Sequence, residues 1–428
     1  MLPLLTGALW PDSAYRRDQL PERVLQFGSG MLLRALCVAA VDAANRAGAR
    51  AGRIVVVQST AEGAVRARAL SAQDGLFTLV ERGLSGGAPL ERMGLIGAIS
   101  RALAADDVAA NPSIQVIVSN VSEAGFRIDA PFPGRLTDAL HARFTRAPDA
   151  PPVFVIPTEL VPDNGPRLAA MVDELAGRQE RPQAFRGWLK ARVRFCSSLV
   201  DRIVTVPPPD QHESLEAQLG YRDALLTVTE PYALWAIEAD PAELHPAFPV
   251  ASITVVVKPD ITFYRERKLR LLNALHTATT PVALLAGVRI VRDATQHPLL
   301  SAFQKRLLFE EIIPATDLPA GEARAFAHAV LERFANPWLE HEWRVIATNQ
   351  EEKFRIRVVP LIVRRPDLPG LALAAAAHLT FTRAPAHALG EAARIPEFIA
   401  ATTQWMAVLA RDGVEAALIR LLETARCT

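Results

Sequence analysis

The chain has 428 residues, of which 50% are hydrophobic and 22% are charged. A chain of this length and composition can bury a large core and suggests two to three domains, so it is neither a disordered tail nor a fibre. Its 47 basic and 46 acidic residues give a formal net charge of +1. This balance argues against a nucleic-acid-binding protein, because such proteins carry clustered positive charge.

The composition also predicts no metal site and no membrane partner. Cys37, Cys196 and Cys427 are too scattered for a disulfide framework, and the nine histidines show no paired metal-binding spacing. Residues 1–11 have no signal-peptide pattern. The longest apolar run, Leu371–Ala377, is far shorter than the roughly 20 residues needed to cross a bilayer. We therefore expect a reduced, cytoplasmic protein.

Short β-branched runs alternate with helical stretches in the first half of the chain. The strand-like runs are 23–27, 54–57, 114–118 and 153–156, and the helical stretches include 31–46, 61–69 and 136–144. Uninterrupted apolar strands of this kind are typical of a parallel sheet that is covered on both faces. The alternation predicts a doubly wound α/β sheet.

The second half of the chain has a different pattern. After the strand-like run 253–257, nearly all of the hydrophobic spacing is helical, with expected helices over 323–334, 371–379 and 405–422 and prolines between the helical stretches. The sequence therefore predicts an α/β domain over residues 1–257 and a mainly α-helical domain over residues 258–428.

Gly28-Ser29-Gly30 stands between the first strand and the first helix. In a dinucleotide-binding fold, such glycines allow a tight turn and close approach of a pyrophosphate to the helix N-terminus. The fingerprint is incomplete, because Leu33 occupies the third glycine position. The second strand ends in Gln58-Ser59-Thr60 without the usual acidic residue, so this motif does not decide between NAD and NADP. Its place in the first βα unit favours cofactor binding over an ordinary turn.

The segment Ser119–Gly125 follows the third strand, at the sheet edge where open α/β folds bind ligands. Asn120 and Ser122 fit two interpretations equally well, as helix-capping residues or as cofactor contacts.

Lys268, Asn273 and His276 lie in the run 266–278, near the start of the helical half. On an α-helix, with about 100° per residue, Asn273 lies roughly 140° and His276 roughly 80° from Lys268, so one broad face could carry all three. A lysine can exchange a proton with a hydroxyl, and amide or imidazole groups can hold a carbonyl oxygen. Taken singly, each residue also fits an ordinary core or surface role.

Seven segments together resemble a known family. They are QFGSGMLLRA (26–35), QDGLFT (73–78), SNVSEAGF (119–126), PTELVPDNG (157–165), FCSSLVDRIVT (195–205), ERKLRLLNALHTA (266–278) and KFRIR (353–357). In this order they resemble the mannitol dehydrogenase family of long-chain polyol dehydrogenases, most closely its tagaturonate reductase branch. The branch is indicated by Glu159-Leu160, where mannitol and fructuronate enzymes have an aspartate and an asparagine.

The resemblance implies a Rossmann-like N-terminal domain and a metal-independent transfer of hydride between NAD(H) and a ketone or secondary alcohol. It implies that Lys268 is the general acid/base, that Asn273 polarises the carbonyl and that His276 positions the substrate. The implied cofactor contacts are Phe27, Gly28, Ser29, Gly30, Met31, Leu32, Asn120 and Glu123. The implied substrate contacts are Glu159, Asp201, Lys353 and, with weaker correspondence, Arg344.

The expected substrate is a small uronate or polyol, with D-tagaturonate and D-altronate as the favoured pair. Fructuronate and mannonate, or a neutral polyol such as mannitol, remain alternatives within the family. A non-catalytic paralogue that binds a dinucleotide is a further alternative, because the glycine fingerprint is incomplete and the segment after Lys353 is shorter than in typical tagaturonate reductases. The departures from the family at Thr158 and Ala274 leave the precise substrate open. The oligomeric state does not follow from the sequence.

Overall fold

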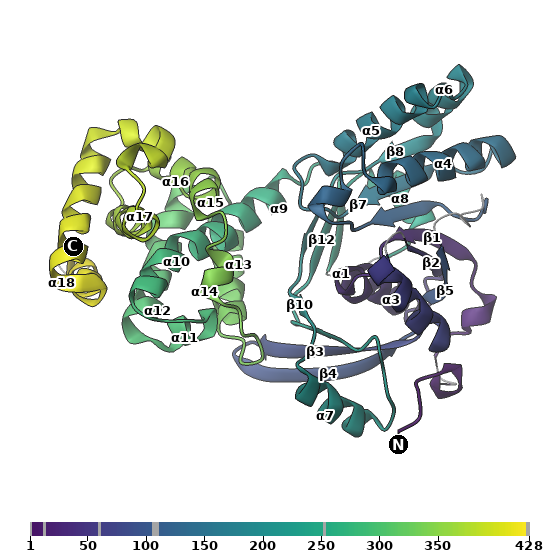
Figure 1. Cartoon of the computed structure of the whole chain (residues 1–428), viewed down its shortest axis with the longest axis horizontal. Coiled ribbons are helices and arrows are strands. Elements are labelled where there is room, and N and C mark those ends of the chain that lie inside the picture. Colours follow the sequence, from purple (N-terminus) through teal and green to yellow (C-terminus); the bar gives the residue numbers. More distant parts are fainter. Residues whose placement is uncertain (1, 12–13, 59–60, 105–110, 251–253, 425–428) are drawn as a thin grey trace. The chain divides into compact units, whose positions relative to one another are not determined.

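The computed structural model describes residues 2–11, 14–58, 61–104, 111–250 and 254–424 (Figure 1). Ser59, Thr60, Cys427 and the start of the strand-like run at residue 253 therefore lie outside the described residues. The chain forms two compact units. The first contains Met1–Arg82 and Leu90–Ile261, and the second contains Gly83–Pro89 and Thr262–Thr428.

A six-stranded parallel sheet forms the centre of the first unit. Its strands are β1 (Glu22–Phe27), β2 (Arg53–Gln58), β5 (Ile99–Ala104), β6 (Val116–Ser119), β7 (Val153–Pro157) and β8 (Val193–Phe195), in the order β5-β2-β1-β6-β7-β8. Neighbouring strands pair in parallel throughout. The predicted α/β fold with a Rossmann-like sheet is confirmed.

Alternate residues of each central strand pack into different hydrophobic cores. Val24 and Val56 belong to one core cluster, whereas their neighbours Leu25 and Val55 belong to another. Successive side chains of a strand point to opposite faces, so an uninterrupted apolar run supplies both cores. The surrounding helices are α1 (Met31–Leu33), η3 (Arg34–Val38), α2 (Ala39–Arg46), α3 (Ala61–Ala72), α4 (Pro131–Arg146), α5 (Asn164–Arg178) and α6 (Gln183–Arg192).

Two smaller sheets complete the first unit's strand structure. One has the order β10 (Val204–Thr205), β11 (Thr227–Thr229), β3 (Phe77–Ser85), β4 (Ala88–Ile96), and the other has the order β13 (Val255–Lys258), β12 (Leu234–Glu238), β9 (Ser198–Asp201). The remaining elements are η1 (Gly7–Leu9), η2 (Arg17–Gln19), η5 (Glu123–Gly125), α7 (Pro209–Leu219) and α8 (Pro241–Ala247). The turn between β3 and β4 lies in the segment that belongs to the second unit.

The second unit is mainly helical, as predicted (Figure 1). Its helices are α9 (Thr262–Arg267), η6 (Lys268–Ala274), α10 (Leu275–Leu285), α11 (Val291–Gln296), α12 (Pro298–Arg306), η7 (Leu307–Ile312), η8 (Ile313–Ala315), α13 (Ala320–Phe334), α14 (Trp343–Ile346), α15 (Gln350–Arg357), α16 (Val359–Arg364), α17 (Pro369–Thr382), η9 (Ala386–Arg394) and α18 (Pro396–Thr424). Every residue of α17 from Gly370 to Leu379 is buried. A helix that is apolar all round belongs in a core, and α17 indeed packs against α10 and α18.

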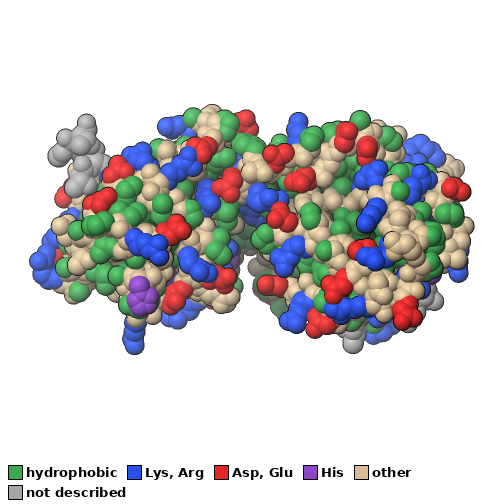
Figure 2. Space-filling model, turned by 90° about the horizontal axis from the view of Figure 1, so that it is seen from above, with side chains coloured by type: hydrophobic (Ala, Val, Ile, Leu, Met, Phe, Trp, Pro, Cys, Tyr) green, Lys and Arg blue, Asp and Glu red, His purple; other side chains and the backbone are tan. Residues whose placement is uncertain are grey.

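Basic and acidic side chains are interspersed over the face drawn in Figure 2, in keeping with the balanced composition. In the part of the chain that the structure describes, no helix is both long and apolar enough to span a membrane.

Candidate active site

The predicted glycine turn joins β1 to a continuous helix over residues 31–46. Gly28 has a φ of +112°, and a Cβ atom there would lie 2.7 Å from the carbonyl oxygen of Asn120, so the position requires glycine. A Cβ atom on Gly30 would meet none of the described atoms within 4 Å. Gly30 precedes the helix, and none of the described side chains caps its first N–H groups. The turn therefore offers open N–H donors to an anion.

Arg34 stabilises this turn through hydrogen bonds, and it was not predicted from the sequence. Its Nη1 donates to the carbonyl oxygen of Ser29 at 2.6 Å, and its Nε donates to Thr227 Oγ1 at 3.1 Å. Burial lowers the pKa of Arg34 to about 10, so the group stays charged near neutral pH. The Ser29 hydroxyl donates to Gln58 Oε1 at 2.7 Å, at the end of β2. These bonds fix the turn before any ligand binds.

Asn120 lies at the carboxyl end of β6, beside the glycine turn. Its N–H donates to the Phe27 carbonyl oxygen at 3.1 Å, and its Nδ2 donates to Thr158 Oγ1 at 3.0 Å. The Thr158 hydroxyl donates in turn to the Ser119 carbonyl oxygen at 2.7 Å. The capping interpretation is right for Ser122, whose hydroxyl accepts from the Gly125 N–H, and wrong for Asn120.

Glu159 is buried at the end of β7, and both of its carboxylate oxygens accept hydrogen bonds. Oε1 accepts from the Val121 N–H at 3.0 Å, and Oε2 accepts from the Ser119 hydroxyl at 3.2 Å. Burial raises the pKa of Glu159, and the Val121 N–H opposes that rise. Its neighbour Leu160 is 79% exposed. Glu159 therefore fixes the segment 119–121 that follows β6.

The other predicted residues of the first unit occupy different surroundings. Asp201 is buried at the end of β9 and lies opposite Leu234 of β12 in the antiparallel register. Glu123 is exposed at the start of η5. Met31 and Leu32 form the first turn of the helix after the glycines and are partly buried.

Lys268 and Asn273 lie in η6, a π-helical segment inside one continuous helix over residues 262–285. The sequence predicted regular α-helix here, and that local expectation was wrong. A π-helix bonds residue i to residue i+5 and has more residues per turn than an α-helix, so Lys268 and Asn273 lie closer to one helix face than the roughly 140° of a regular α-helix would allow. Hydrophobic spacing does not reveal one extra residue in a turn. Such segments are frequent at functional sites.

His276 follows in α10 and is held among aromatic rings. It stacks on Phe334 with a centroid distance of 4.1 Å and an interplanar angle of 14°, and meets His341 and Trp343 edge-on at 5.6 and 6.0 Å. Its buried Nε2 has no hydrogen-bond partner among the described residues. Burial lowers the pKa of His276 well below its usual value, and nearby basic groups lower it further. The imidazole is therefore neutral.

Thr277, next to His276, anchors both ends of α15. Pro281 lies inside α10 and has no N–H, so the Thr277 carbonyl four residues earlier loses its helical donor. Gln350 Nε2 donates to this carbonyl at 2.9 Å. Arg357 Nη1 donates to the Thr277 hydroxyl at 3.2 Å. The proline thus creates an attachment point that places α15 beside the His276 turn.

Lys353 lies on α15, and its Nζ donates to the Ile346 carbonyl oxygen at 2.9 Å. Burial lowers the pKa of Lys353, and Arg357 lowers it further. Arg357 bonds to Thr277, the residue after His276, and Lys353 lies on the same helix as Arg357, so the structure brings these three residues together. Both cations help to lower the pKa of His276. Arg344 is exposed on α14. Arg357, His341 and Trp343 were not predicted as site residues from the sequence.

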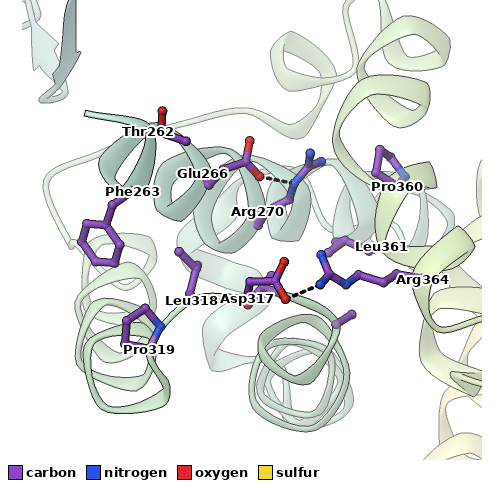
Figure 3. Close-up of a pocket in the computed structure, with 12 residues that line it drawn as sticks. Thr262, Phe263, Glu266, Arg270, Asp317, Leu318, Pro319, Pro360, Leu361 and Arg364 are labelled. Carbon is purple, nitrogen blue, oxygen red and sulfur yellow. Dashed lines mark hydrogen bonds and ion pairs between the residues drawn. The ribbon is translucent and has the colours of Figure 1, made fainter. Parts of the chain in front are cut away.

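A separate pocket of about 380 Å³ lies between α9, η6, η8 and α16 (Figure 3). Its four charged groups form two ion pairs: Arg270 with Glu266, at 2.9 Å, and Arg364 with Asp317. We call these four residues the paired pocket. Arg270 also donates from Nη1 to the carbonyl oxygens of Ile356 and Arg357, both at 3.1 Å, and so supports the end of α15.

Within the described ranges, no three histidine, cysteine, aspartate or glutamate side chains gather as metal ligands would.

Comparison with known protein families identifies both units. Residues 22–247 match the mannitol dehydrogenase Rossmann domain, and residues 260–420 match the mannitol dehydrogenase C-terminal domain. The altronate oxidoreductase of Klebsiella pneumoniae (strain 342) is 37% identical over 399 residues, which cover 86% of this chain and 82% of that protein. The altronate oxidoreductase of Bacillus subtilis (strain 168) is 35% identical over 372 residues, covering 82% of this chain and 77% of that protein.

Solved structures show the same fold. The ternary complex of Pseudomonas fluorescens mannitol 2-dehydrogenase with NAD and D-mannitol aligns with a TM-score of 0.73 at 24% identity, covering 98% of this chain and 99% of that one. A substrate-free D-sorbitol dehydrogenase aligns with a TM-score of 0.83 at 20% identity, covering 97% and 100%.

Proposed function

The chain belongs to the mannitol dehydrogenase family, and we propose that it is an NAD-dependent oxidoreductase that interconverts D-tagaturonate and D-altronate. The observation that carries this proposal is its similarity, at 35–38% identity over most of the chain, to relatives named altronate oxidoreductase. Glu159-Leu160 supports the same branch.

The first unit fits a dinucleotide at the glycine turn. We assign the pyrophosphate to the N–H groups between Gly28 and Leu32, since Gly30 leaves room there and the helix N-terminus favours an anion. Phe27 precedes this turn, and Asn120 and Glu123 follow the adjacent strand. When bound, NAD(H) would donate or accept the hydride at its nicotinamide ring.

The second unit would supply the proton chemistry. In the reductive direction Asn273 would donate a hydrogen bond from its amide to the keto oxygen, and this bond strengthens as negative charge develops. The Lys268 ammonium would then protonate the new alkoxide, leaving a neutral amine that regains a proton from solvent. His276, held neutral, would orient the substrate through the unpaired Nε2. The oxidative direction reverses these steps.

We assign Lys353 and Asp201 to substrate binding, since one offers a cation and the other a buried carboxylate that can accept bonds from sugar hydroxyls. Glu159 would act by holding the segment 119–121, because both of its oxygens already accept bonds from that segment. Arg344 remains a proposed substrate contact from the resemblance alone.

The test is the rate of nicotinamide oxidation by the purified protein, with NADH or NADPH offered against tagaturonate, fructuronate and fructose. We expect turnover of tagaturonate with NADH. Faster turnover of fructuronate or fructose would move the protein to a neighbouring branch of the family. Tight NADH binding without turnover of any ketose would overturn the enzymatic proposal in favour of a non-catalytic paralogue.

A further inference from the structure

The surroundings of His276 contain more positive charge than the protein itself balances. Lys353 bonds to a backbone carbonyl and Arg357 bonds to a threonine hydroxyl. Among the described residues neither cation has a carboxylate partner. We call these two residues the cation cluster. Both side chains are partly buried. A partly buried cation without a counter-charge is unfavourable, because its desolvation is not offset by a paired anion.

The placement of the cation cluster on one helix makes its burial still less favourable. Lys353 and Arg357 are four residues apart on α15, so they share one helix face and repel each other. The acidic residues of the same helix, Glu351 and Glu352, are exposed and pair with neither cation. Burial lowers the pKa of both Lys353 and Arg357, as expected where water is partly excluded and no anion compensates.

In the paired pocket of the same unit, the arginines are neutralised by neighbouring carboxylates. There, Arg270 and Arg364 each have a carboxylate partner. Arg357 instead uses one nitrogen for Thr277 Oγ1 and keeps further N–H donors for another acceptor. A guanidinium with two free donors matches the two oxygens of a carboxylate.

We propose that Arg357, together with Lys353, binds the carboxylate of the substrate beside His276, and that Arg357 selects uronates over uncharged ketoses. This inference rests on the proposed function, because it requires the substrate to bind next to His276. The substrate carboxylate would be the counter-charge that the two cations lack among the described residues. It also assigns the carboxylate to a residue that is anchored to the turn following His276, so that the acid group fixes the distance of the keto carbon from Asn273.

The experiment compares two substrates in the full-length protein. Kinetics with D-tagaturonate and with D-tagatose, its uncharged counterpart, would be measured for the wild type, Arg357→Met, Arg357→Lys and the control Arg355→Met. Arg355 is an exposed arginine on the same helix, two residues away. We expect Arg357→Met to lower kcat/KM for tagaturonate about 100-fold, mainly through KM. Its kcat/KM for tagatose should fall by a much smaller factor, because tagatose has no carboxylate, and its affinity for NADH should not change. Arg357→Lys should recover part of the loss.

A second measurement separates binding from folding. The KM of the wild type for tagaturonate should rise with ionic strength, and this dependence should weaken in Arg357→Met, since salt screens an ion pair. Equal losses with both substrates, or an unchanged salt dependence, would overturn the role of Arg357 while leaving the reaction intact. If the wild type reduces tagatose but not tagaturonate, the proposed uronate activity itself fails.

Discussion

The paired pocket and the cation cluster lie in the same helical unit but treat charge in opposite ways. In the paired pocket every arginine has its own carboxylate. Within the described part of the chain, the two members of the cation cluster bond to neutral oxygens only. A ligand entering the paired pocket must compete with existing ion pairs. An anion entering the cation cluster meets positive charge that is already partly desolvated, and there the attraction is stronger than in water.

The paired pocket and the cation cluster are also connected by hydrogen bonds, through which the paired pocket supports the helix that carries the cation cluster. Arg270 belongs to the paired pocket, yet it donates to the carbonyl oxygens of Ile356 and Arg357 at the end of α15. Ion pairs therefore brace the backbone from one direction, while the side chains of α15 stay available for a substrate. The paired charges of this unit stabilise its structure, whereas the cations without a carboxylate partner in the described ranges are available to bind a ligand.

The largest expected effect is at the chemistry beside the cation cluster. Lys268→Ala removes the proposed proton donor, so kcat should fall by about 10³-fold, within the usual range for general acid/base catalysis. Steady-state rates with tagaturonate and NADH measure this. Lys305→Ala is the matched control, since Lys305 is exposed on α12 of the same unit. Full activity of Lys268→Ala would refute the assigned proton transfer.

The sequence was sufficient to predict the parts of the molecule that depend on local pattern. Runs such as 54–57 predicted parallel strands because burial on both faces leaves them continuously apolar, and the helix after Gly30 followed from regular spacing. The β3–β4 hairpin was not foreseen. Most residues of β4 are exposed and only its last residue, Ile96, is buried, so the strand lacks the uninterrupted apolar run used to identify the others.

The candidate site was predicted only where residues carry recognisable motifs. Gly28 and Lys268 could be predicted from the local sequence motifs around them. Arg34 could not, because its partner Thr227 lies 193 residues away in the chain. Arg357 was missed for the same reason, since its importance depends on Pro281 freeing a carbonyl that α15 then binds. One available signal was the i, i+4 spacing of Lys353 and Arg357, two cations on one short helix.

We expect acid to lower the stability of the protein through a buried histidine, His378, which packs against the helix that carries the cation cluster. His378 on α17 is fully buried against Phe354 of α15, with a centroid distance of 4.3 Å, and neither ring nitrogen has a partner among the described residues. Burial lowers the pKa of His378 to about 4. The unfolded histidine titrates near 6.5, so its contribution to stability is complete above that pH and is lost as pH falls toward 4.

The predicted loss is about 3 kcal/mol in the free energy of unfolding between pH 7 and pH 4. His378→Leu should remove this part of the acid sensitivity, as measured by urea denaturation at pH 7 and pH 4. The control is His387→Leu, at an exposed histidine of η9. An identical pH dependence in wild type and His378→Leu would show that the buried ring is not the acid-sensitive group.

A smaller effect should follow from loosening the cation cluster without removing its charge. Thr277→Val keeps the side-chain volume but deletes the hydroxyl that accepts from Arg357, so the guanidinium loses its anchor. Hydrogen bonds to charged groups contribute about 1.5–3 kcal/mol, and kcat/KM for tagaturonate should fall about 10-fold. Thr279→Val is the control, because the buried Thr279 hydroxyl has no partner among the described residues. Comparable losses in both variants would contradict a specific role for the Arg357 anchor.

The smallest effect is expected in the paired pocket itself. Arg364→Met breaks the ion pair with Asp317, whose side chain is 81% exposed while that of Arg364 is 52% exposed. Water can solvate the remaining carboxylate, and exposed ion pairs add little to stability. We therefore expect no change in kcat/KM for either tagaturonate or tagatose, and no measurable change in Tm. Arg364→Met and Arg357→Met remove the same charge from neighbouring helices, so their contrast isolates the effect of position. A selective loss of tagaturonate turnover in Arg364→Met would mean that the net charge of the unit, and not the unpaired Arg357, attracts the substrate.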